Sequence, residues 1–182
     1  MVEPPSATHM PGVGVLAGMS WLDRVLGRGD ESDGAGATGG DRHGHGETRV
    51  GLFVDGPNIL RSEFEVDLDD VRAAGQEYGL LSVAALYLDE NASSGLVQAA
   101  ESRGFAVVTT SGDVDVKLAV DATAAAVEDR LDIVAIASRD TDFKPVLEAA
   151  AERSLGTVAI APGEHGRSDA LRNAAQDDIT LE

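Results

Sequence analysis

The fold is decided by the stretch Val50-Gly51-Leu52-Phe53-Val54-Asp55-Gly56-Pro57-Asn58. It begins with a short, continuous apolar run and passes directly into an aspartate followed by residue types that favour turns. An apolar run of this length is typical of a strand buried on both faces inside a parallel sheet. The sequence therefore predicts that Asp55 stands at the C-terminal end of such a strand.

Four more apolar runs follow this one, and helical segments separate them. Strict alternation of strand and helix predicts a three-layer α/β domain, with a parallel sheet of about five strands covered by helices on both faces. With the strand order 3-2-1-4-5, the order reverses between the first and the fourth strand. We expect strands at 50–54, 80–88, 105–109, 133–137 and 157–160, and helices at 68–78, 94–103, 115–129, 142–152 and 168–175.

Residues 1–48 differ in composition from the rest, so we expect an N-terminal extension followed by one domain at 49–182. Within the extension, residues 19–27 carry apolar side chains at the spacing of one short amphipathic helical face. Such a helix is too short to be stable alone, and it can dock on the domain, on a protein partner or on a membrane surface. Residues 30–47 are rich in Gly and Asp, which predicts a flexible, disordered linker.

Composition excludes several classes of protein. Hydrophobic residues make up 43% of the chain, which is enough for a core and argues against global disorder. There are no cysteines, which excludes disulfides and thiolate metal sites. No stretch is long and apolar enough to cross a bilayer, so we expect no stable membrane insertion and a cytoplasmic location.

The chain is strongly acidic, with 32 Asp and Glu against 14 Lys and Arg and a net charge of -18. Two interpretations compete: an acidic functional surface, or the solvated acidic skin of a protein from a high-salt (halophilic) cytoplasm. We favour the second, because the acids are scattered along the whole chain. The chain has no broad basic footprint for nucleic acid. In molar salt, however, the Debye length falls to about 3 Å, so that local arginines and a bound metal would suffice for RNA.

Aspartates recur where the strands that flank the expected reversal end. Asp55 follows the first strand, and Asp140 and Asp142 follow the fourth. The long helix expected between these strands also starts acidic, at Asp113 and Asp115. Because function in open parallel sheets lies outside the C-terminal strand ends at such a reversal, we expect these remote segments to bring like charges together there.

Carboxylates within a few ångströms repel one another unless one takes up a proton or they share a cation. Hard oxygen donors suit Mg²⁺ or Mn²⁺. Such a metal activates water for attack on a phosphodiester. Asp55 and Asp140 are the expected direct metal ligands. Asp115 and Asp142 are expected to bind through water or to position the nucleophile, and Asn58 to hold a phosphate oxygen or to orient Asp55.

Each of these signals also has a purely structural explanation. The stretch 55–58 consists of residue types that favour turns. Asp140 and Asp142 suit the start of a helix. Asp121 lies four residues after Lys117, so that the two can form an ion pair on one helical face. Only the joint placement of the acids at one predicted edge favours a functional site.

Three blocks of the chain resemble the NYN domain family, a branch of the PIN-like nucleases. Together they are specific, and the resemblance extends over about Arg49 to Leu181 in the family's order and spacing. It extends more narrowly to archaeal members with a variable N-terminal extension. The blocks are Phe53-Val54-Asp55-Gly56-Pro57-Asn58-Ile59, Val114-Asp115-Val116-Lys117-Leu118-Ala119-Val120-Asp121 and Ala137-Ser138-Arg139-Asp140-Thr141-Asp142-Phe143-Lys144-Pro145, with Ser168-Asp169-Ala170-Leu171-Arg172 and Asp178-Ile179 near the end.

The resemblance implies a Rossmann-like, PIN-like fold, a divalent metal and cleavage of RNA. It assigns the acidic site to four main positions and two lesser ones: Asp55, Asp115, Asp140 and Asp142, then Asn58 and Asp121.

The chain departs from the family pattern at two places. The family commonly has Ser-Gly-Asp where this chain has Ser138-Arg139-Asp140, and Lys-Gly where it has Gly112-Asp113. We expect Ser138 at the substrate side of the site. Arg139 either contacts a substrate phosphate or points to solvent, and Lys117 is the candidate to replace the lost lysine.

Three functions compete at this point. A metal-dependent endoribonuclease is the leading one. A non-catalytic RNA-binding or regulatory module is the alternative, because the surface is acidic and the few aromatic residues offer little stacking for bases. A different Rossmann-like phosphate-processing enzyme is the third, although Pro57 stands where a dehalogenase-like phosphatase has its second aspartate, and the first strand lacks the Gly-rich turn of a dinucleotide binder. The sequence does not indicate an oligomeric state.

Overall fold

The computed structural model describes residues 47–164 and 168–181. The helix expected at 19–27 and the linker at 30–47 therefore lie outside the described residues, apart from Glu47. The elements of the described part are β1 (Arg49–Asp55), α2 (Gly56–Ile59), α3 (Leu68–Gln76), β2 (Leu80–Asp89), α4 (Ser94–Ser102), β3 (Ala106–Thr110), α5 (Val114–Val127), β4 (Ile133–Ala137), η1 (Thr141–Phe143), α6 (Lys144–Glu152), β5 (Gly156–Ala161), α7 (Asp169–Ala174) and β6 (Asp177–Thr180).

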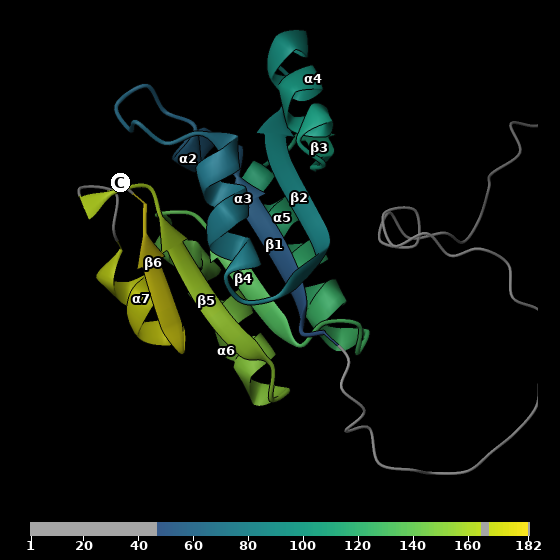
Figure 1. Cartoon of the computed structure of the whole chain (residues 1–182), viewed down its shortest axis with the longest axis vertical. Coiled ribbons are helices and arrows are strands. Elements are labelled where there is room, and N and C mark those ends of the chain that lie inside the picture. Colours follow the sequence, from purple (N-terminus) through teal and green to yellow (C-terminus); the bar gives the residue numbers. More distant parts are fainter. Residues whose placement is uncertain (1–46, 165–167, 182) are drawn as a thin grey trace, which may run out of the picture.

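One sheet forms the middle of the domain (Figure 1). Its strand order is β3-β2-β1-β4-β5-β6, and every neighbouring pair is parallel. The predicted order 3-2-1-4-5 is thus confirmed for the first five strands. Because all strands run the same way, their C-terminal ends form one edge, and the order reverses there between β1 and β4.

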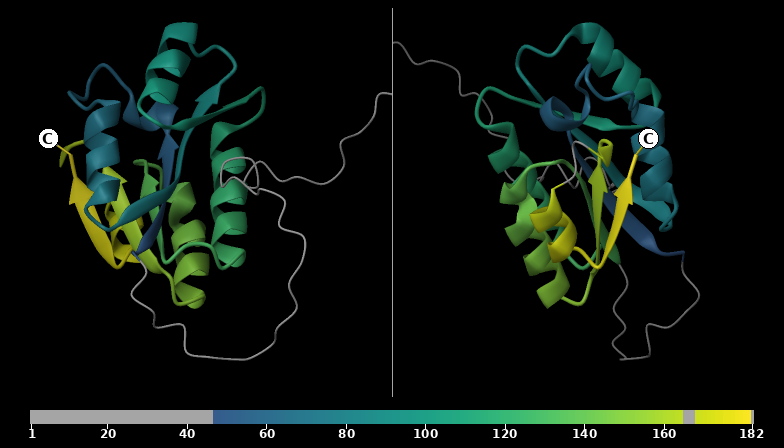
Figure 2. Two further views of the ribbon diagram at one scale, coloured as in Figure 1. Left: turned by 45° about the vertical axis from the view of Figure 1, so that its right-hand side comes forward. Right: turned by 90° about the vertical axis from the view of Figure 1, so that its left-hand side faces the viewer.

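Helices cover both faces of the sheet and enclose two apolar cores. α5, α6 and α7 pack on one face, around Phe53, Leu118 and Leu147. α3 and α4 pack on the other, around Leu52 and Val71. Figure 2 shows the two helical layers on opposite sides of the strands. Successive residues of β1 thus point into different cores, which explains why this strand is apolar without alternation.

The sheet has six strands, one more than the predicted number of about five, and the additional strand is β6. This strand pairs with β5 at the edge of the sheet. It has the sequence Asp-Asp-Ile-Thr and is partly exposed, so it has no apolar run by which sequence alone would reveal it. The helix predicted at 142–152 also differs, because a 3₁₀ turn at Thr141–Phe143 precedes α6.

No helix of the described part is long and apolar enough to span a bilayer.

Candidate functional site

Asp55 stands at the C-terminal end of β1, fully buried, and its carboxylate is held by hydrogen bonds. Ser138 Oγ and Asn58 Nδ2 each donate to its Oδ2 at 2.7 Å. The backbone N–H of Asn58 donates to its Oδ1 at 3.3 Å, so Asp55 also caps the short helix α2. Burial raises the pKa of Asp55, the three hydrogen bonds oppose that rise, and the nearby charge of Asp140 adds to it. The carboxylate is therefore fixed in position.

Gly56 allows α2 to start directly beside β2. A Cβ at this position would lie 2.7 Å from the carbonyl oxygen of Tyr87, a backbone atom that cannot give way. The turn-forming composition after Asp55 thus has a packing reason as well as a conformational one. α2 presents Asn58 to the edge of the sheet.

Ser138 joins the ends of the two central strands. It is buried at the end of β4, where it donates to Asp55 and accepts a hydrogen bond from the backbone N–H of Asp140 at 3.0 Å. Asp140 Oδ1 in turn accepts from the backbone N–H of Asp142 at 3.0 Å and caps η1. One hydroxyl group thus fixes Asp140 relative to Asp55.

Asp115 adds a charge from a third stretch of chain, the first turn of α5. Partial burial raises its pKa most. The negative charges of Asp55, Asp140, Asp142 and Asp113 raise it further. No described residue donates a hydrogen bond to this carboxylate. Asp115 therefore experiences the field of the whole acidic group, and only the N-terminal end of α5, with no basic side chain or hydrogen-bond donor of the described part, offsets it.

The acidic side chains of the site do not form a closed metal cage as they stand in the described part of the chain. Among residues 47–164 and 168–181, no three His, Cys, Asp or Glu side chains stand close enough together to hold one. The donors are nevertheless of the hard oxygen type that Mg²⁺ and Mn²⁺ prefer. Asp115 and Asp140 are partly exposed and Asp142 is exposed, so changes of rotamer are open to them, whereas Asp55 is fixed.

Arg139 packs against the segment after α2. Its Nε donates to Asn58 Oδ1 at 3.2 Å, and its Nη1 lies 3.5 Å from Glu63 Oε1. Its guanidinium carbon lies 5.8 Å from the centre of the Phe64 ring, within cation–π range. The side chain therefore does not extend freely into solvent, and Asn58 and Glu63 already engage part of its guanidinium group. Sequence reasoning missed Glu63 and Phe64, because both fall between the predicted elements.

Lys117 and Asp121 form a separate unit inside the fold. Lys117 Nζ lies 2.7 Å from Asp121 Oδ1, and Tyr87 donates to Asp121 Oδ2 at 3.1 Å. Asp121 is only 4% exposed, so this pairing supplies the cation that a buried carboxylate needs. The structure thus places both residues in the ion pair that their spacing allowed. Sequence reasoning missed Tyr87, because its hydroxyl arrives from the middle of an apolar strand.

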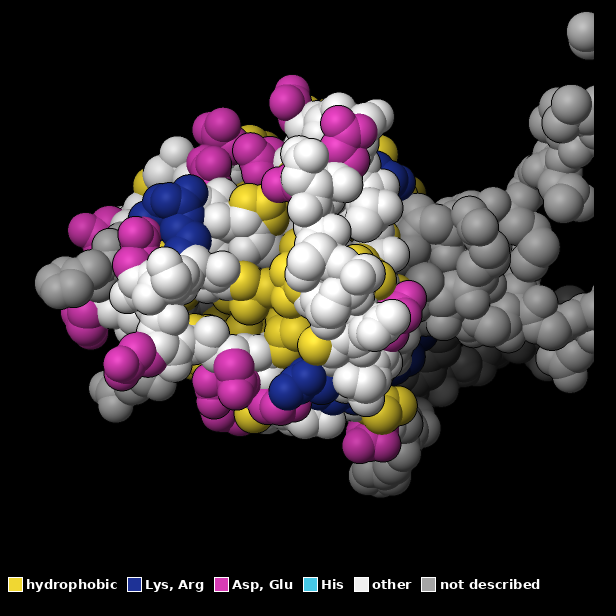
Figure 3. Space-filling model, turned by 90° about the horizontal axis from the view of Figure 1, so that it is seen from above, with side chains coloured by type: hydrophobic (Ala, Val, Ile, Leu, Met, Phe, Trp, Pro, Cys, Tyr) yellow, Lys and Arg dark blue, Asp and Glu magenta, His cyan; other side chains and the backbone are white. Residues whose placement is uncertain are grey.

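Figure 3 shows the molecule from the side to which the C-terminal strand ends point. Acidic side chains gather around a hydrophobic middle, and Lys and Arg form separate small groups.

The structure connects Asp55, Asn58, Ser138 and Asp140 by hydrogen bonds, and it brings Asp115 and Asp142 within electrostatic range of this group.

Comparison with known proteins agrees with this architecture. A solved structure of a protein of unknown function from Vibrio parahaemolyticus matches with a TM-score of 0.66 at 18% identity. The match covers 77% of this chain and 96% of that one, and it supports the fold alone.

Two comparisons of sequence bear on the family. An uncharacterized protein of Methanocaldococcus jannaschii is 41% identical over 136 residues, a match that covers 75% of this chain. It covers 56% of that protein, so the chain spans about half the length of this relative. The family model of the NYN domain matches residues 49–182. The resemblance inferred from the three sequence blocks is thereby confirmed, and the chain belongs to the NYN domain family.

Proposed function

We propose that this protein is a metal-dependent ribonuclease that hydrolyses phosphodiester bonds of RNA at the acidic edge of the sheet. The observation that carries the proposal is that the Ser138 hydroxyl joins Asp55 and Asp140 at the ends of β1 and β4, while Asp115 of α5 lies close enough for their charges to raise its pKa in addition to its partial burial. Uncompensated like charges reduce stability, and such perturbed groups cluster at functional sites. Membership of the NYN family supports the same assignment.

The residues have separate parts in this proposal. Asp115, Asp140 and Asp142 would hold Mg²⁺ or Mn²⁺, after changes of rotamer that bring their carboxylates together. When bound, the cation lowers the pKa of water and neutralises charge on the phosphorus oxygens. Asp55, expected from the sequence to bind the metal directly, is buried and already accepts three hydrogen bonds, so its proposed part is to keep Ser138 oriented and to add negative charge to the site.

The polar groups around the acids serve to position the substrate. Asn58 has its amide oxygen engaged by Arg139 and its amide nitrogen engaged by Asp55. Arg139 is therefore aligned beside the carboxylates, where its remaining N–H groups would bind one phosphate of the RNA. The proposed role of Arg139 is to orient the strand rather than to take part in proton transfer.

A second candidate is a non-catalytic RNA-binding module. The observation in its favour is that no three acidic or histidine side chains of the described part already enclose an ion. The two candidates differ in one measurable respect: both bind RNA, and only the first shortens it.

The test compares the parent chain with Asp115→Asn. No described residue bonds to the Asp115 carboxylate, so this change removes charge without removing a structural contact. Asp129→Asn is the matched control, since it makes the same change just beyond the opposite end of α5, where a φ of 56° suits asparagine. Cleavage of single-stranded RNA is measured with Mn²⁺ or Mg²⁺ and with chelator, and thermal unfolding is followed in parallel.

The outcomes separate the candidates. Cleavage that needs metal, disappears in Asp115→Asn and survives in Asp129→Asn supports the nuclease. Binding of RNA without cleavage under any metal condition favours the module. Cleavage that persists both in chelator and in Asp115→Asn overturns the assigned site.

A further inference from the structure

The outer side of α5 is apolar where a solvent-facing helix is normally polar. Val116 and Val120 are each 60% exposed, and Val127 is 50% exposed. The inner side of the same helix is also apolar, and helices that are hydrophobic all round are usually covered. In a chain with a net charge of -18, an uncharged helical face is a departure from the rest of the surface. Contiguous exposed apolar patches mark sites of interaction.

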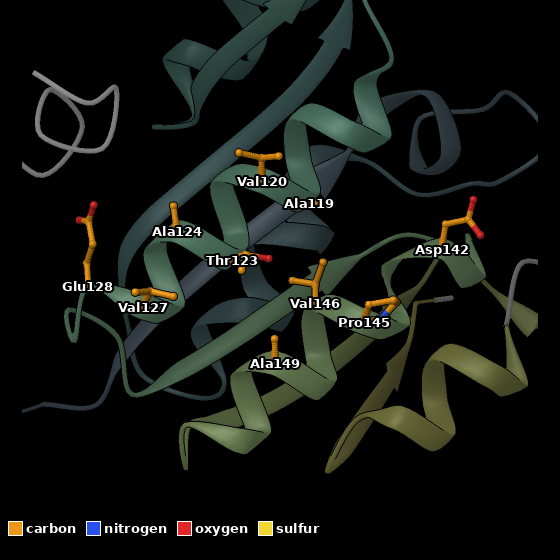
Figure 4. Close-up of a pocket in the computed structure, with 10 residues that line it drawn as sticks. All are labelled: Ala119, Val120, Thr123, Ala124, Val127, Glu128, Asp142, Pro145, Val146 and Ala149. Carbon is orange, nitrogen blue, oxygen red and sulfur yellow. The ribbon is translucent and has the colours of Figure 1, made fainter.

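Val120 and Val127 of this face lie in one wall of a groove between α5 and α6 (Figure 4). The groove has a volume of about 720 Å³ and an apolar lining that includes Val120, Val127 and Val146. Its only charged lining residues are Glu128 and Asp142, which lie at opposite ends in Figure 4. The groove thus has the shape and chemistry to receive an apolar helical segment that carries basic residues near one end.

We propose that residues 19–27 of this same chain dock in the α5–α6 groove as a short helix. The segment has the sequence Met-Ser-Trp-Leu-Asp-Arg-Val-Leu-Gly, and Trp21, Leu22, Val25 and Leu26 fall on one helical face. Nine helical residues extend about 13 Å, and the 14 residues of α5 extend about 21 Å, so the segment fits within the groove. A helix this short needs such a surface to be stable.

The chain enters the domain beside one end of the groove. The backbone N–H of Arg49 donates to Asp132 Oδ2 at 2.8 Å, and its Nη1 donates to the carbonyl oxygen of Asp129 at 3.5 Å. Asp129 directly follows Glu128, the residue at that end of the groove. The start of β1, and with it the attachment point of the N-terminal extension, is therefore adjacent to the proposed docking surface.

The intervening chain has the length that docking requires. Residues 28–46 are rich in glycine, and a flexible chain of roughly 20 residues spans about 25 Å on average. That distance matches the length of α5. Such a tether gives an effective concentration on the order of 1 mM, so even a weak intrinsic affinity keeps the segment docked.

Charge favours the same occupant. Arg24 and Arg28 are two of only 14 basic residues in the chain, and they lie in and directly after the apolar segment. The ends of the groove are acidic, at Glu128 and Asp142. Arg24 and Arg28 are one helical turn apart, so they complement one acidic end of the groove, at Glu128 beside the attachment point, while the apolar side chains of the segment complement the walls. The docking does not depend on whether the acidic site cleaves RNA.

Trp21 provides a direct test, because it is the chain's only tryptophan. In the full-length parent, we expect blue-shifted Trp21 emission that is protected from acrylamide. Val120→Glu places a charge on an exposed groove position, so folding is retained and the emission shifts to that of an indole in water. Leu80→Glu is the matched control, since Leu80 is 51% exposed and lies outside the groove. Circular dichroism verifies that both variants are folded.

Three results would overturn the proposal. Trp21 emission that already equals that of indole in water in the parent shows that the segment does not dock. Emission that is unchanged by Val120→Glu places the segment elsewhere. A blue shift that grows with protein concentration, together with a dimer mass in light scattering, assigns the groove to a second copy. A concentration-independent blue shift in a monomer, lost only in Val120→Glu, supports docking within one chain.

Discussion

Replacement of Ser138 by alanine tests whether one hydroxyl group supports the ionised form of Asp55. The hydroxyl donates to Asp55 Oδ2 at 2.7 Å and accepts from the backbone N–H of Asp140 at 3.0 Å. Both Ser138 and Asp55 are buried, so water does not readily take the place of the lost group. The Ser138→Ala variant therefore leaves a buried carboxylate with one donor fewer.

The expected loss of stability in Ser138→Ala follows from these two hydrogen bonds. Asn58 still donates to the same carboxylate, so Asp55 is not left without partners. The amide of Asp140 is only part-buried, and water can satisfy it in the variant. A hydrogen bond to an ionised group contributes about 1.5–3 kcal/mol, so we expect the free energy of unfolding to fall by about 2–3 kcal/mol at neutral pH.

The loss is expected to depend on pH. Burial raises the pKa of Asp55 and the bond from Ser138 lowers it, so the pKa rises further in the variant. A carboxylate whose pKa is raised by folding contributes stability below its unfolded pKa and loses that contribution as the pH rises through the folded pKa. The variant therefore loses more stability than the parent between acidic pH, where Asp55 is protonated in both, and neutral pH.

Urea unfolding at acidic and neutral pH, with chelator present, measures this difference. Ser93→Ala is the control, since Ser93 Oγ caps α4 by accepting from the Leu96 N–H at 3.2 Å and bonds to no carboxylate. Loss of that cap is expected to reduce stability by about 1 kcal/mol at both pH values. A Ser138→Ala loss that is no larger than this, or that is equal at both pH values, would refute the reasoning.

Three further predictions concern the scaffold. Lys117→Met leaves the buried carboxylate of Asp121 without its lysine partner. We therefore expect the free energy of unfolding, measured in urea, to fall by about 1–3 kcal/mol, and to recover in part when Asp121→Asn is added. Gly79→Ala adds a Cβ at a φ of 146° against a backbone carbonyl oxygen. We expect the free energy of unfolding to fall by about 3 kcal/mol in the same urea measurement. Burial and a hydrogen bond to a carboxylate raise the pKa of Tyr78 to about 12, and the pKa of Tyr87 is raised as well. The absorbance of tyrosinate in the native chain should therefore not rise near pH 10. The stability that Tyr78 contributes is fully present below its unfolded pKa of 10.0, and it should be lost as the pH rises towards its folded pKa of about 12.

Sequence predicted the fold where burial on both faces imposes a continuous apolar run. β1 and β4 have such runs, and their order in the sheet followed from the alternation with helices. β6 and α2 have no such pattern. β6 lies at an edge and tolerates Asp177 and Asp178, while α2 is four residues long and is held by the carboxylate of Asp55. Elements fixed by tertiary contacts rather than by their own pattern were therefore missed.

The candidate site was predictable only to the level of the backbone. The ends of β1 and β4 place Asp55 and Asp140 at one edge, and that placement follows from topology. Which partner each side chain takes depends on rotamers and on residues from other segments. Ser138 as the link between the two aspartates, and Phe64 beneath Arg139, are contacts of this kind.

Three aspartates of this fold differ in what stabilises their negative charge, and this difference indicates where a bound cation belongs. Asp121 is paired with a lysine of its own helix, and Asp55 is stabilised by three hydrogen-bond donors. Asp115 receives neither, although four other carboxylates raise its pKa. The position one turn along α5, which could carry a basic partner as Lys117 is for Asp121, is occupied by Ala119, a partly buried residue that packs against the core. Proteins retain destabilising groups of this kind where activity requires them. The proposed cation therefore belongs on the Asp115 side of the site, opposite the buried and already satisfied Asp55.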